Sequence, residues 1–503
     1  MKLIGSDLLN YQTKITNYFL KNSKDVLLLY MKVGTGKTLT SLNCAIQAIF
    51  TKKFNKIIVL APKGVFDEFN ENLNLLASFQ KLNTQEIKKL ITYIPYNANN
   101  AQTEFNKIRN LENTIFIIDE AHLFMKSIIK VRLTPGDKIG NIGNAEHIFD
   151  SISKVKNKKI LLLTGTPCAK FAFELVPMFN LAGCNFPVSV DKFNNNYIDS
   201  SIQKVKNEQD FLKRIDGLVA YVNKDNDQHL KSTDLTVVEV PMTVNQYKQY
   251  LLDYSSEVNE KGFSTNVNKY GFHFGKISTF HAKTFADSIA VKNESPKIEK
   301  IYSDCEKING LCCVFFKFVQ IGCNTFEKYL IKHGYSKLNV SKLNKGKHYI
   351  MFTGSESDSL RNKCKKLFNH KDNSHGEYCK YIIISLAGSV GITLKNVKLL
   401  AIGSVDFNYS TILQIMGRVN RYNSHQDLPI NERVLKNYIY ISVKNDSYYT
   451  SHKQEIDLLC SRKTYKFEHE PALCIERIIY QDSIYDNIIL DQFRSLLCKS
   501  SVI

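Results

Sequence analysis

The sequence predicts an α/β protein with two tandem domains, each a parallel β-sheet covered by helices. In the first half, short apolar strands alternate with helical stretches, which is typical of a parallel sheet with helical crossovers. The same alternation resumes after about residue 293. Each half also contains an apolar strand that runs directly into a glycine-containing loop, at residues 26–38 and 381–393. A chain of 503 residues has room for two such domains and an insertion.

The expected first domain covers residues 1–184 and the expected second domain covers residues 293–445. Residues 185–292 are polar and rich in asparagine, so we predict an inter-domain linker with an insertion. The sequence leaves the fold of that segment open, apart from a strand at 237–242. Residues 446–503 are expected to form a short C-terminal extension. The predicted strands are 26–30, 56–61, 115–118 and 159–164 in the first domain, and 311–319, 349–352, 381–385, 397–402 and 438–443 in the second, which begins with a helix near Pro296.

Charge favours a polyanionic partner such as nucleic acid, because the formal net charge is +19. A lysine- and asparagine-rich coding bias would give the same charge. Arginine is more informative, since the chain has only ten arginines and three of them are Arg418, Arg421 and Arg433. This cluster indicates sites that need a planar, permanently charged guanidinium group.

Cysteine usage and hydropathy favour a cytoplasmic protein that is not secreted. The twelve cysteines include no C-x-x-C pair, and many lie in apolar strands, which is typical of reduced thiols rather than disulfides or zinc ligands. No run approaches the roughly 20 apolar residues of a membrane span. The N-terminal residues lack the apolar region of a signal peptide. We therefore expect no membrane partner.

The segment 26–38 has the pattern of a buried strand followed by a phosphate-binding loop. Its two glycines allow a tight turn whose backbone N–H groups point at a polyphosphate. Lys37 would reach the β- and γ-phosphates, and the Thr38 hydroxyl would bind Mg²⁺. The general pattern has glycine where this chain has Met31, so the loop taken alone is also compatible with a glycine-rich turn. The candidate nucleotide-binding residues of the loop are Gly34, Thr35, Gly36, Lys37 and Thr38.

Two carboxylates follow the predicted strand 115–118. The carboxyl edge of an open α/β sheet is where catalytic groups are found. Asp119 can bind the Mg²⁺ together with Thr38, and Glu120 can orient and deprotonate the attacking water. A strand followed by an acidic helix N-terminus is the alternative. The phosphate-loop pattern upstream favours the catalytic interpretation.

Three further segments carry candidate residues. Thr164 and Thr166 could couple the carboxylates to a nucleic-acid groove. Gly391 permits close approach of the backbone to a phosphate or ribose. Arg418 and Arg421 lie three residues apart, which would place them on one helical face, and an arginine that reaches the γ-phosphate stabilises phosphoryl transfer. A solvated basic helix face is the alternative for the arginines.

In chain order these motifs resemble a superfamily-two helicase or translocase: Gly-Thr-Gly-Lys-Thr, Asp-Glu-Ala-His, Thr-Gly-Thr-Pro, the glycine loop and Gln-x-x-Gly-Arg-x-x-Arg. The resemblance runs from about residue 8 to 443. It implies two RecA-like domains facing a nucleotide cleft, with ATP and Mg²⁺ as cofactors. It also implies that Gln12, in Leu-Asn-Tyr-Gln, reads adenine, and that Gln414 belongs to the catalytic set with the two arginines.

Residues 313–322, 348–354 and 418–434 resemble more closely the DNA-dependent nucleoside triphosphatases of poxviruses and other large cytoplasmic DNA viruses, of the nucleoside triphosphatase I and early transcription factor small subunit type. This resemblance implies ATP hydrolysis coupled to movement on DNA in viral transcription, in the host cytoplasm or the virion. The protein partners it implies are RNA polymerase and other transcription factors. RNA is the alternative to DNA as the nucleic acid that the protein moves along. A non-catalytic transcription or packaging scaffold that keeps the fold is the rival function.

Overall fold

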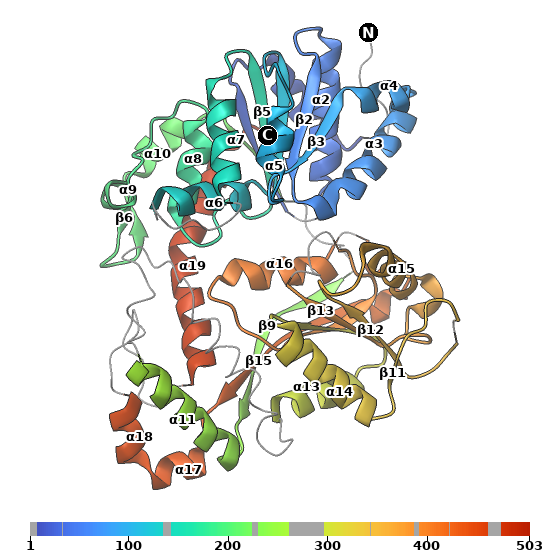
Figure 1. Cartoon of the computed structure of the whole chain (residues 1–503), viewed down its shortest axis with the longest axis vertical. Coiled ribbons are helices and arrows are strands. Elements are labelled where there is room, and N and C mark those ends of the chain that lie inside the picture. Colours follow the sequence, from blue (N-terminus) through green and yellow to red (C-terminus); the bar gives the residue numbers. More distant parts are fainter. Residues whose placement is uncertain are drawn as a thin grey trace. The chain divides into compact units, whose positions relative to one another are not determined.

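The chain folds into two compact units in the structure, a computed structural model that describes residues 8–32, 34–133, 142–223, 230–260, 296–342, 344–386, 392–421, 423–460 and 474–503. One unit comprises residues 1–224 together with 486–503, and the other comprises residues 225–485. Figure 1 shows the two units and labels many of their helices and strands.

The first unit is built on a six-stranded sheet in the order β3-β2-β4-β5-β1-β8, in which every pair of neighbours is parallel. All residues of β1 and β4 are buried, as expected for a parallel sheet covered on both faces. The strands are β1 Val26–Met31, β2 Lys56–Ala61, β3 Ile91–Pro95, β4 Thr114–Asp119, β5 Lys158–Thr164 and β8 Val219–Val222, and a separate antiparallel pair is formed by β6 Ile198–Asp199 and β7 Lys204–Val205.

Helices α1, α2 and α3 pack together on one face of this sheet in a single hydrophobic cluster. Their apolar side chains recur at helical spacing, as Ile15 and Phe19 do in α1 and as Phe69 and Leu73 do in α3. The helices of the unit are α1 Asn10–Lys21, α2 Lys37–Phe50, α3 Phe66–Gln80, α4 Thr84–Lys89, α5 Ala101–Asn106, α6 Ala121–Leu133, α7 Ile142–Lys154, α8 Leu175–Asn180, α9 Val190–Tyr197, α10 Glu208–Ile215 and the C-terminal part of α19 Ile475–Lys499.

The second unit is built on a seven-stranded sheet in the order β11-β12-β13-β10-β14-β15-β9, again with parallel neighbours throughout. The edge strand β9 precedes the other strands in sequence and runs along the whole of β15. The strands are β9 Lys231–Pro241, β10 Leu311–Phe316, β11 Ser336–Lys337, β12 His348–Phe352, β13 Tyr381–Ser385, β14 Val397–Ile402 and β15 Val434–Val443.

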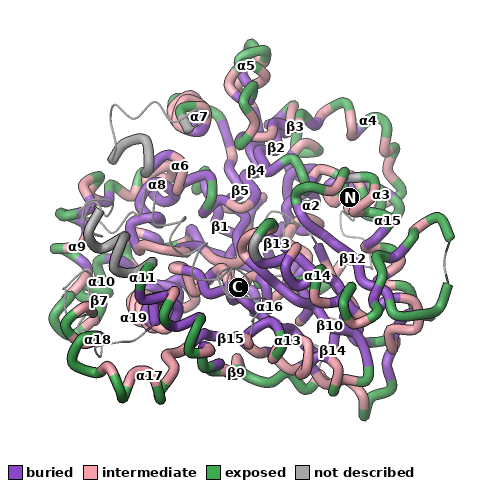
Figure 2. The backbone as a smooth tube through the Cα atoms, turned by 60° about the horizontal axis from the view of Figure 1, so that its bottom comes forward, coloured by how far each residue is buried: buried purple, intermediate pink, exposed green. Residues whose placement is uncertain are grey.

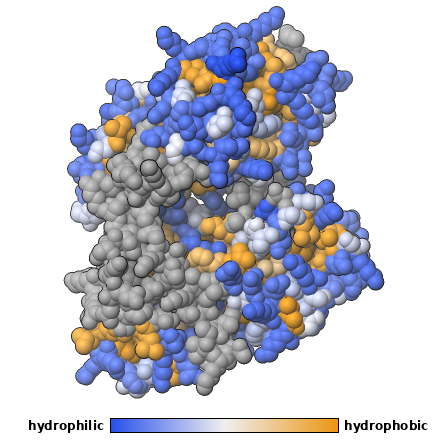
Figure 3. Space-filling model, in the orientation of Figure 1, coloured by the Kyte–Doolittle hydropathy of each residue, from blue (hydrophilic) through white to orange (hydrophobic). Residues whose placement is uncertain are grey.

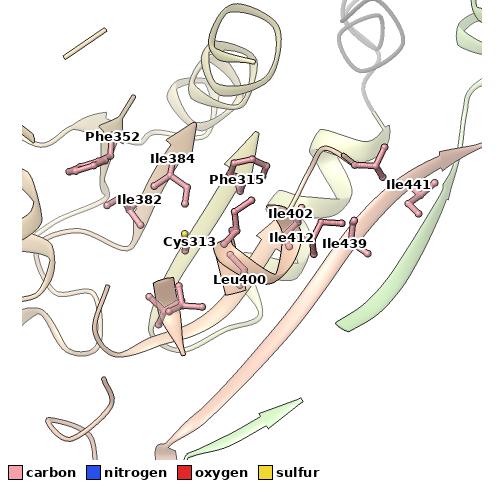
Figure 4. Packing of buried hydrophobic residues seen from close by; sticks show 14 of the residues in the cluster. Cys313, Phe315, Phe352, Ile382, Ile384, Leu400, Ile402, Ile412, Ile439 and Ile441 are labelled. Atoms are coloured by element: carbon pink, nitrogen blue, oxygen red, sulfur yellow. The ribbon is translucent and has the colours of Figure 1, made fainter. Parts of the chain in front are cut away.

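Alternating residues of the central strands enter two cores, one on each face of the sheet. In β10, Cys313 and Phe315 join one cluster, whereas Cys312, Val314 and Phe316 join the other. Figure 4 shows the first cluster, and Figure 2 shows that the central strands of both sheets are largely buried. The first core is covered by residues of α11, α15 and α16, and the second by residues of α13 and α14. The helices are α11 Val244–Glu260, α13 Pro296–Glu306, α14 Asn324–Lys332, α15 Asp358–Phe368, α16 Tyr409–Val419, α17 Asp446–Ser451 and α18 Lys453–Cys460.

The predicted linker does not form one connecting segment. Its first part, including α9, α10 and β8, belongs to the first unit, and its strand at 237–242 is part of β9 in the second sheet. The predicted C-terminal extension is also divided, because residues 486–503 belong to the first unit. Residues 261–292 of the predicted insertion lie outside the described residues.

A buried ion pair ties α13 to α19 within the second unit. Lys297 and Glu476 are 3% and 0% exposed, and their charged groups contact each other directly. Glu476 also accepts a hydrogen bond from the backbone N–H of Ser442 in β15 (2.7 Å). Burial raises the pKa of Glu476 above its usual value. Removing only one of the two charges should therefore be strongly destabilising, because the other charge would stay buried without its ion-pair partner.

We expect Lys297→Met to lower the free energy of unfolding of this unit by about 3–5 kcal/mol. Adding Glu476→Gln, which keeps an acceptor for Ser442, should recover part of that loss because no buried charge remains. Hydrogen exchange of the β15 amides measures the effect on this unit alone. A double variant as unstable as the sum of the two single variants would contradict the explanation.

Candidate active site

The carboxyl edge of the first sheet brings three of the predicted motifs together. In the strand register Tyr30 lies opposite Thr164, and Leu163 lies opposite Asp119. Because β5 lies between β1 and β4, the loops that follow these three strands leave the sheet side by side. The phosphate loop, the carboxylates and the Thr-Gly-Thr-Pro segment therefore share one edge, as the sequence predicts.

The phosphate loop takes the backbone conformation that its glycines permit. Gly34 and Gly36 have φ of +86° and +75°, in the left-handed region that favours glycine. The Lys37 ammonium donates to the Met31 carbonyl (3.3 Å), and the Thr35 hydroxyl donates to the Lys32 carbonyl (2.6 Å). Helix α2 begins at Lys37. Its N-terminal N–H groups and the positive end of its dipole would therefore face a phosphate group bound in the loop.

Two residues of α1 contact this loop. The Tyr11 hydroxyl donates to the carbonyl of Thr35 (2.7 Å). The Gln12 carboxamide oxygen accepts a hydrogen bond from the Leu9 N–H (3.0 Å), which caps the start of α1. A Cβ at Gly36 would lie 2.7 Å from the amide nitrogen of Gln12, so the loop packs closely on this side chain. The predicted reading of adenine by Gln12 stays a prediction.

A buried polar network fixes α1 against α2 and α3. The amide of Asn43 donates to the hydroxyl of Thr16 (2.8 Å) and accepts from Gln80 (2.6 Å). The Thr16 hydroxyl in turn donates to the carbonyl of Gln12 (2.9 Å). Satisfied buried networks of this kind specify one packing arrangement, which here sets the position of Tyr11 and Gln12 beside the loop.

The carboxylate pair follows β4 in an unusual backbone conformation. Glu120 has φ of +46°, a left-handed geometry that costs a non-glycine residue roughly 1–3 kcal/mol. Asp119 is 7% exposed. Burial, followed by the neighbouring charge of Glu120, raises the pKa of Asp119, while Lys37 lowers it. A buried carboxylate beside a second carboxylate is a site that a cation would stabilise.

His122 connects Glu120 to the Thr-Gly-Thr-Pro segment. Its Nδ1 lies 2.9 Å from the Thr164 hydroxyl and 3.4 Å from a carboxylate oxygen of Glu120. The Thr164 hydroxyl also accepts from the backbone N–H of Thr166 (3.0 Å). Burial lowers the pKa of His122 to about 4, so the imidazole is neutral at pH 7. The carboxylate and the loop after β5 are thus joined by hydrogen-bonding groups.

Tyr96 also reaches this site and was not predicted from the sequence. It is 4% exposed, and its hydroxyl lies 3.5 Å from the Glu120 carbonyl. Burial, together with the Glu120 and Asp119 charges, raises the pKa of Tyr96 well above its usual value. The contact of Tyr11 with the phosphate loop was not predicted either. The only sequence signal for it was the position of Tyr11 next to Gln12.

The residues of this edge fit a magnesium–nucleotide complex. Hydroxyl and carboxylate oxygens, as in Thr38 and Asp119, are the ligand types that Mg²⁺ uses together with substrate phosphates. Within the described part of the chain no group of three or more His, Cys, Asp or Glu side chains is arranged to hold a metal ion. A Mg²⁺ ion at this edge would be held by the Thr38 hydroxyl and the Asp119 carboxylate together with nucleotide oxygens and water.

We expect Lys37→Ala to weaken ATP binding as well as turnover. The ammonium lies at the loop and would interact with the phosphates in the ground state as well as the transition state, so its loss affects both. Equilibrium binding of a fluorescent ATP analogue measures the first effect, and steady-state hydrolysis measures the second. Unchanged nucleotide affinity in this variant would contradict the assignment of the loop.

The candidate residues of the second unit are only partly arranged as predicted. Helix α16 carries Gln414 and Arg418 but ends at Val419, so Arg421 follows the helix and the predicted shared helical face is wrong. The Asn420 backbone leaves the helical conformation at the C-cap. Gly391 lies outside the described residues.

The guanidinium groups near the end of α16 have different surroundings. Arg418 is 8% exposed. Arg421 donates to the Thr393 hydroxyl and to the Gly417 carbonyl (3.3 Å). Arg433 instead donates to the carbonyls of Leu428 and Gln426, at 3.0 and 3.1 Å. Arg433 therefore holds its own loop through two guanidinium donors.

Family models match both units. The family described as "Type III restriction enzyme, res subunit" matches residues 6–169, and the family described as "Helicase conserved C-terminal domain" matches residues 296–423. The chain belongs to superfamily two of the helicases. Its two parallel sheets are the tandem RecA-like domains of a superfamily-two helicase, and the phosphate-loop and Asp-Glu-Ala-His motifs lie in the part matched by the first family.

Relatives of this helicase occur in large DNA viruses. Proteins named termination factor NPH-I homolog, from African swine fever virus, are 25% identical to it over 84% of this chain and 70% of their own length. A protein of Acanthamoeba polyphaga mimivirus with an ATP-dependent RNA helicase name is 25% identical over 84% of this chain and 79% of its own length.

Solved structures align with this helicase over most of its length. The SWI2/SNF2 ATPase core of Sulfolobus solfataricus in complex with dsDNA covers 98% of this chain and 97% of its own, with 15% identity and a TM-score of 0.37. The Hef helicase domain of Pyrococcus furiosus covers 88% and 98%, with 14% identity and a TM-score of 0.41. Among the described residues, no helix of this helicase has the length and apolar character of a membrane span.

Proposed function

We propose that this helicase is a nucleic-acid-stimulated ATPase that moves along DNA during viral transcription in the host cytoplasm or the virion. One observation carries the catalytic part of the proposal. Lys37 at the start of α2 and Asp119 and Glu120 at the end of β4 lie at the same sheet edge, and Glu120 is linked through His122 to Thr164 at the end of β5.

Each residue of the edge has a separate proposed role. The loop N–H groups and Lys37 bind the β- and γ-phosphates. Thr38 and Asp119 hold Mg²⁺, which when bound neutralises charge that develops on the phosphate oxygens. Glu120 orients the attacking water and takes its proton. Arg418 and Arg421 stabilise the charge of the transferring phosphoryl group.

The proposed track is the phosphate backbone of a nucleic acid. Much of the coloured surface in Figure 3 is hydrophilic. The net charge of +19 suits electrostatic binding to phosphates with little base readout. The African swine fever virus relatives are named as termination factor homologs, which favours a role in transcription. The resemblance to DNA-dependent viral nucleoside triphosphatases favours DNA as the track and RNA polymerase or other transcription factors as partners. The helicase name of the mimivirus relative keeps RNA as the second candidate.

A non-catalytic scaffold that keeps the fold is the rival function. Such a protein has no need of the carboxylate that would activate water. Glu120 is present, its side chain is 24% exposed, and it faces His122 at 3.4 Å. The intact carboxylate and phosphate loop together favour turnover over a scaffold.

ATP hydrolysis measured in parallel with single-stranded DNA, duplex DNA, RNA and no polymer tests the proposal. We expect hydrolysis to rise most with DNA. A high basal rate that no polymer changes would indicate a stand-alone nucleotidase, and no hydrolysis under any condition would support the scaffold.

We expect DNA affinity to fall steeply with salt, with a log–log slope of about −0.7 to −0.9 for each phosphate contacted. The reason is that binding releases counterions from the polymer. The half-maximal DNA concentration for ATPase stimulation should follow the same salt dependence. Fluorescence anisotropy with several unrelated sequences measures both the slope and the selectivity, and tight binding to one sequence that salt barely changes would indicate a dedicated recognition factor.

A further inference from the structure

The end of the chain is an integral part of the first unit. In this unit the described residues after 485 form the last part of α19, in which Leu490, Phe493 and Leu497 are buried. The chain then passes beside β8, where the Val502 N–H donates to the Val219 carbonyl (2.9 Å). The Tyr221 N–H donates to the Ser501 hydroxyl (2.9 Å). The C-terminal residues therefore complete this side of the sheet.

Phe493 enters a cluster of aromatic rings formed by the region after β5. Its ring lies 5.9 Å from that of Phe193 and 5.2 Å from that of Phe211. The rings of Phe186 and Tyr197 join the same cluster. Close aromatic pairs of this kind hold an element in one orientation, which fixes the direction in which the next residue of α19 points.

That next residue, Arg494, binds the loop that follows the Thr-Gly-Thr-Pro segment. Its side chain is only 9% exposed, and it donates to the carbonyl of Cys168 (2.6 Å). The same guanidinium donates to the side chains of Asn487 and Asp491 (2.7 Å each). A planar fork with several donors is suited to hold a backbone carbonyl and two side chains at once.

Cys168 is close in sequence to Thr164, whose hydroxyl contacts His122 beside the Glu120 carboxylate. Thr166 lies two residues earlier and donates its N–H to the Thr164 hydroxyl, which lies 2.9 Å from His122. On the other side of Cys168, the Ala169 N–H donates to Glu174 (2.6 Å). The loop is thus held at one end by Glu174 and in its middle by Arg494.

We propose that Arg494 is a positioning residue for ATP hydrolysis: it holds the loop 164–168 and, through Thr164 and His122, the orientation of Glu120. The inference rests on the proposed function for its catalytic consequence. Arg494 is more than 300 residues from the Thr-Gly-Thr-Pro segment in the sequence. It is connected to the catalytic edge through its hydrogen bond to the Cys168 carbonyl.

Arg494→Lys tests the proposal, because lysine keeps the charge but cannot hold three acceptors in the same plane. We expect kcat to fall by about 10- to 100-fold, as for small misplacements of catalytic groups, with KM for ATP and nucleotide affinity close to wild type. Lys499→Met is the matched control, since it removes a cation from the same helix, and Lys499 is 60% exposed with a distant partner, Glu208, at 3.9 Å. Its kcat should stay at the wild-type value.

A double-variant cycle separates positioning from general stability. If Arg494 acts through Thr164, then adding Arg494→Lys to Thr164→Val should reduce kcat little further, whereas independent effects would multiply. Multiplying effects, or a kcat in Arg494→Lys equal to wild type, would overturn the proposal. Measurements are made well below the melting temperature and normalised to nucleotide-binding sites, so that a loss of folded protein does not count as a loss of kcat.

Hydrogen exchange of the nucleotide-free protein distinguishes failure of this inference from failure of the proposed function. Arg494→Lys should increase exchange of the Thr166 amide and its neighbours while leaving β4 and β5 protected. Exchange of residues 165–174 equal to wild type would refute the positioning role whether or not the protein hydrolyses ATP. A wild-type protein without ATPase activity would refute the proposed function, and with it the catalytic consequence, even if the loop responds.

Discussion

Glu120→Gln is expected to reduce ATP turnover by about 10²–10⁴-fold while ATP binding stays close to wild type. The amide keeps the shape of the side chain but cannot accept the proton of the attacking water. The ground-state contacts of the phosphates are assigned to the loop and Lys37, so affinity should change little. Single-turnover hydrolysis and equilibrium binding of the same ATP analogue measure the two quantities.

The position of Glu120 supports this expectation. Its left-handed backbone turns the side chain at the end of β4, and its carboxylate lies within 3.4 Å of His122. Strain of this kind persists only where the surroundings fix it, and it gathers at functional sites. Removing the charge should also lower the pKa of Asp119, because the Glu120 charge is one of the causes that raise it.

Glu104→Gln is the matched control, since Glu104 is 35% exposed and pairs with Lys107 at the surface of the same unit. It should have wild-type turnover, as exposed pairs contribute little. Near-normal hydrolysis in Glu120→Gln would remove Glu120 from the mechanism. Loss of ATP binding in that variant would instead indicate that the carboxylate is needed to build the binding site.

The strands that carry motifs could be predicted from the sequence because they are continuous apolar runs buried on both faces. Three predicted ranges, 56–61, 381–385 and 397–402, coincide with β2, β13 and β14. Edge strands were harder. β3 has exposed and half-buried positions and was not predicted. β9 is largely exposed, so only its last part, within the range 237–242, was predicted.

The division of the chain into units could not be predicted for a different physical reason. Residues 185–222 are polar enough to suggest a linker, but Phe186, Phe193, Tyr197 and Phe211 are buried together with Phe493. That core depends on residues nearly 300 positions apart, which no local pattern reveals. A fragment ending near residue 184 would lack β8 and the C-terminal helix, so it is not a test of the first unit alone.

The candidate site was predictable where chemistry and local sequence coincide. The phosphate loop, Asp119 and Glu120 follow apolar strands directly, and the strand register brings them to one edge. Tyr11, Tyr96 and Arg494 act through contacts with backbone carbonyls. Every residue has a backbone carbonyl, so the residue that accepts such a hydrogen bond cannot be recognised from its side chain in the sequence.

Arg421→Ala and Arg418→Ala are each expected to reduce ATP turnover by about 10³-fold, in the range found for arginines that stabilise phosphoryl transfer. ATP affinity should change far less, because the charge they stabilise develops in the transition state. Arg421→Lys should not restore turnover. Its planar group contacts Thr393 and Gly417 in two directions, which one ammonium cannot reproduce.

Arg433→Lys is the control for loss of a guanidinium in the same region. Arg433 donates to the Leu428 and Gln426 carbonyls, so its replacement should alter the loop and leave ATP turnover near wild type. The intact chain is used throughout, because residues 486–503 belong to the first unit. If Arg421→Lys hydrolysed ATP as fast as wild type, or if turnover and affinity fell together in all three Arg418 and Arg421 variants, the arginines would be structural. Hydrolysis would then depend on the phosphate loop and the carboxylates alone.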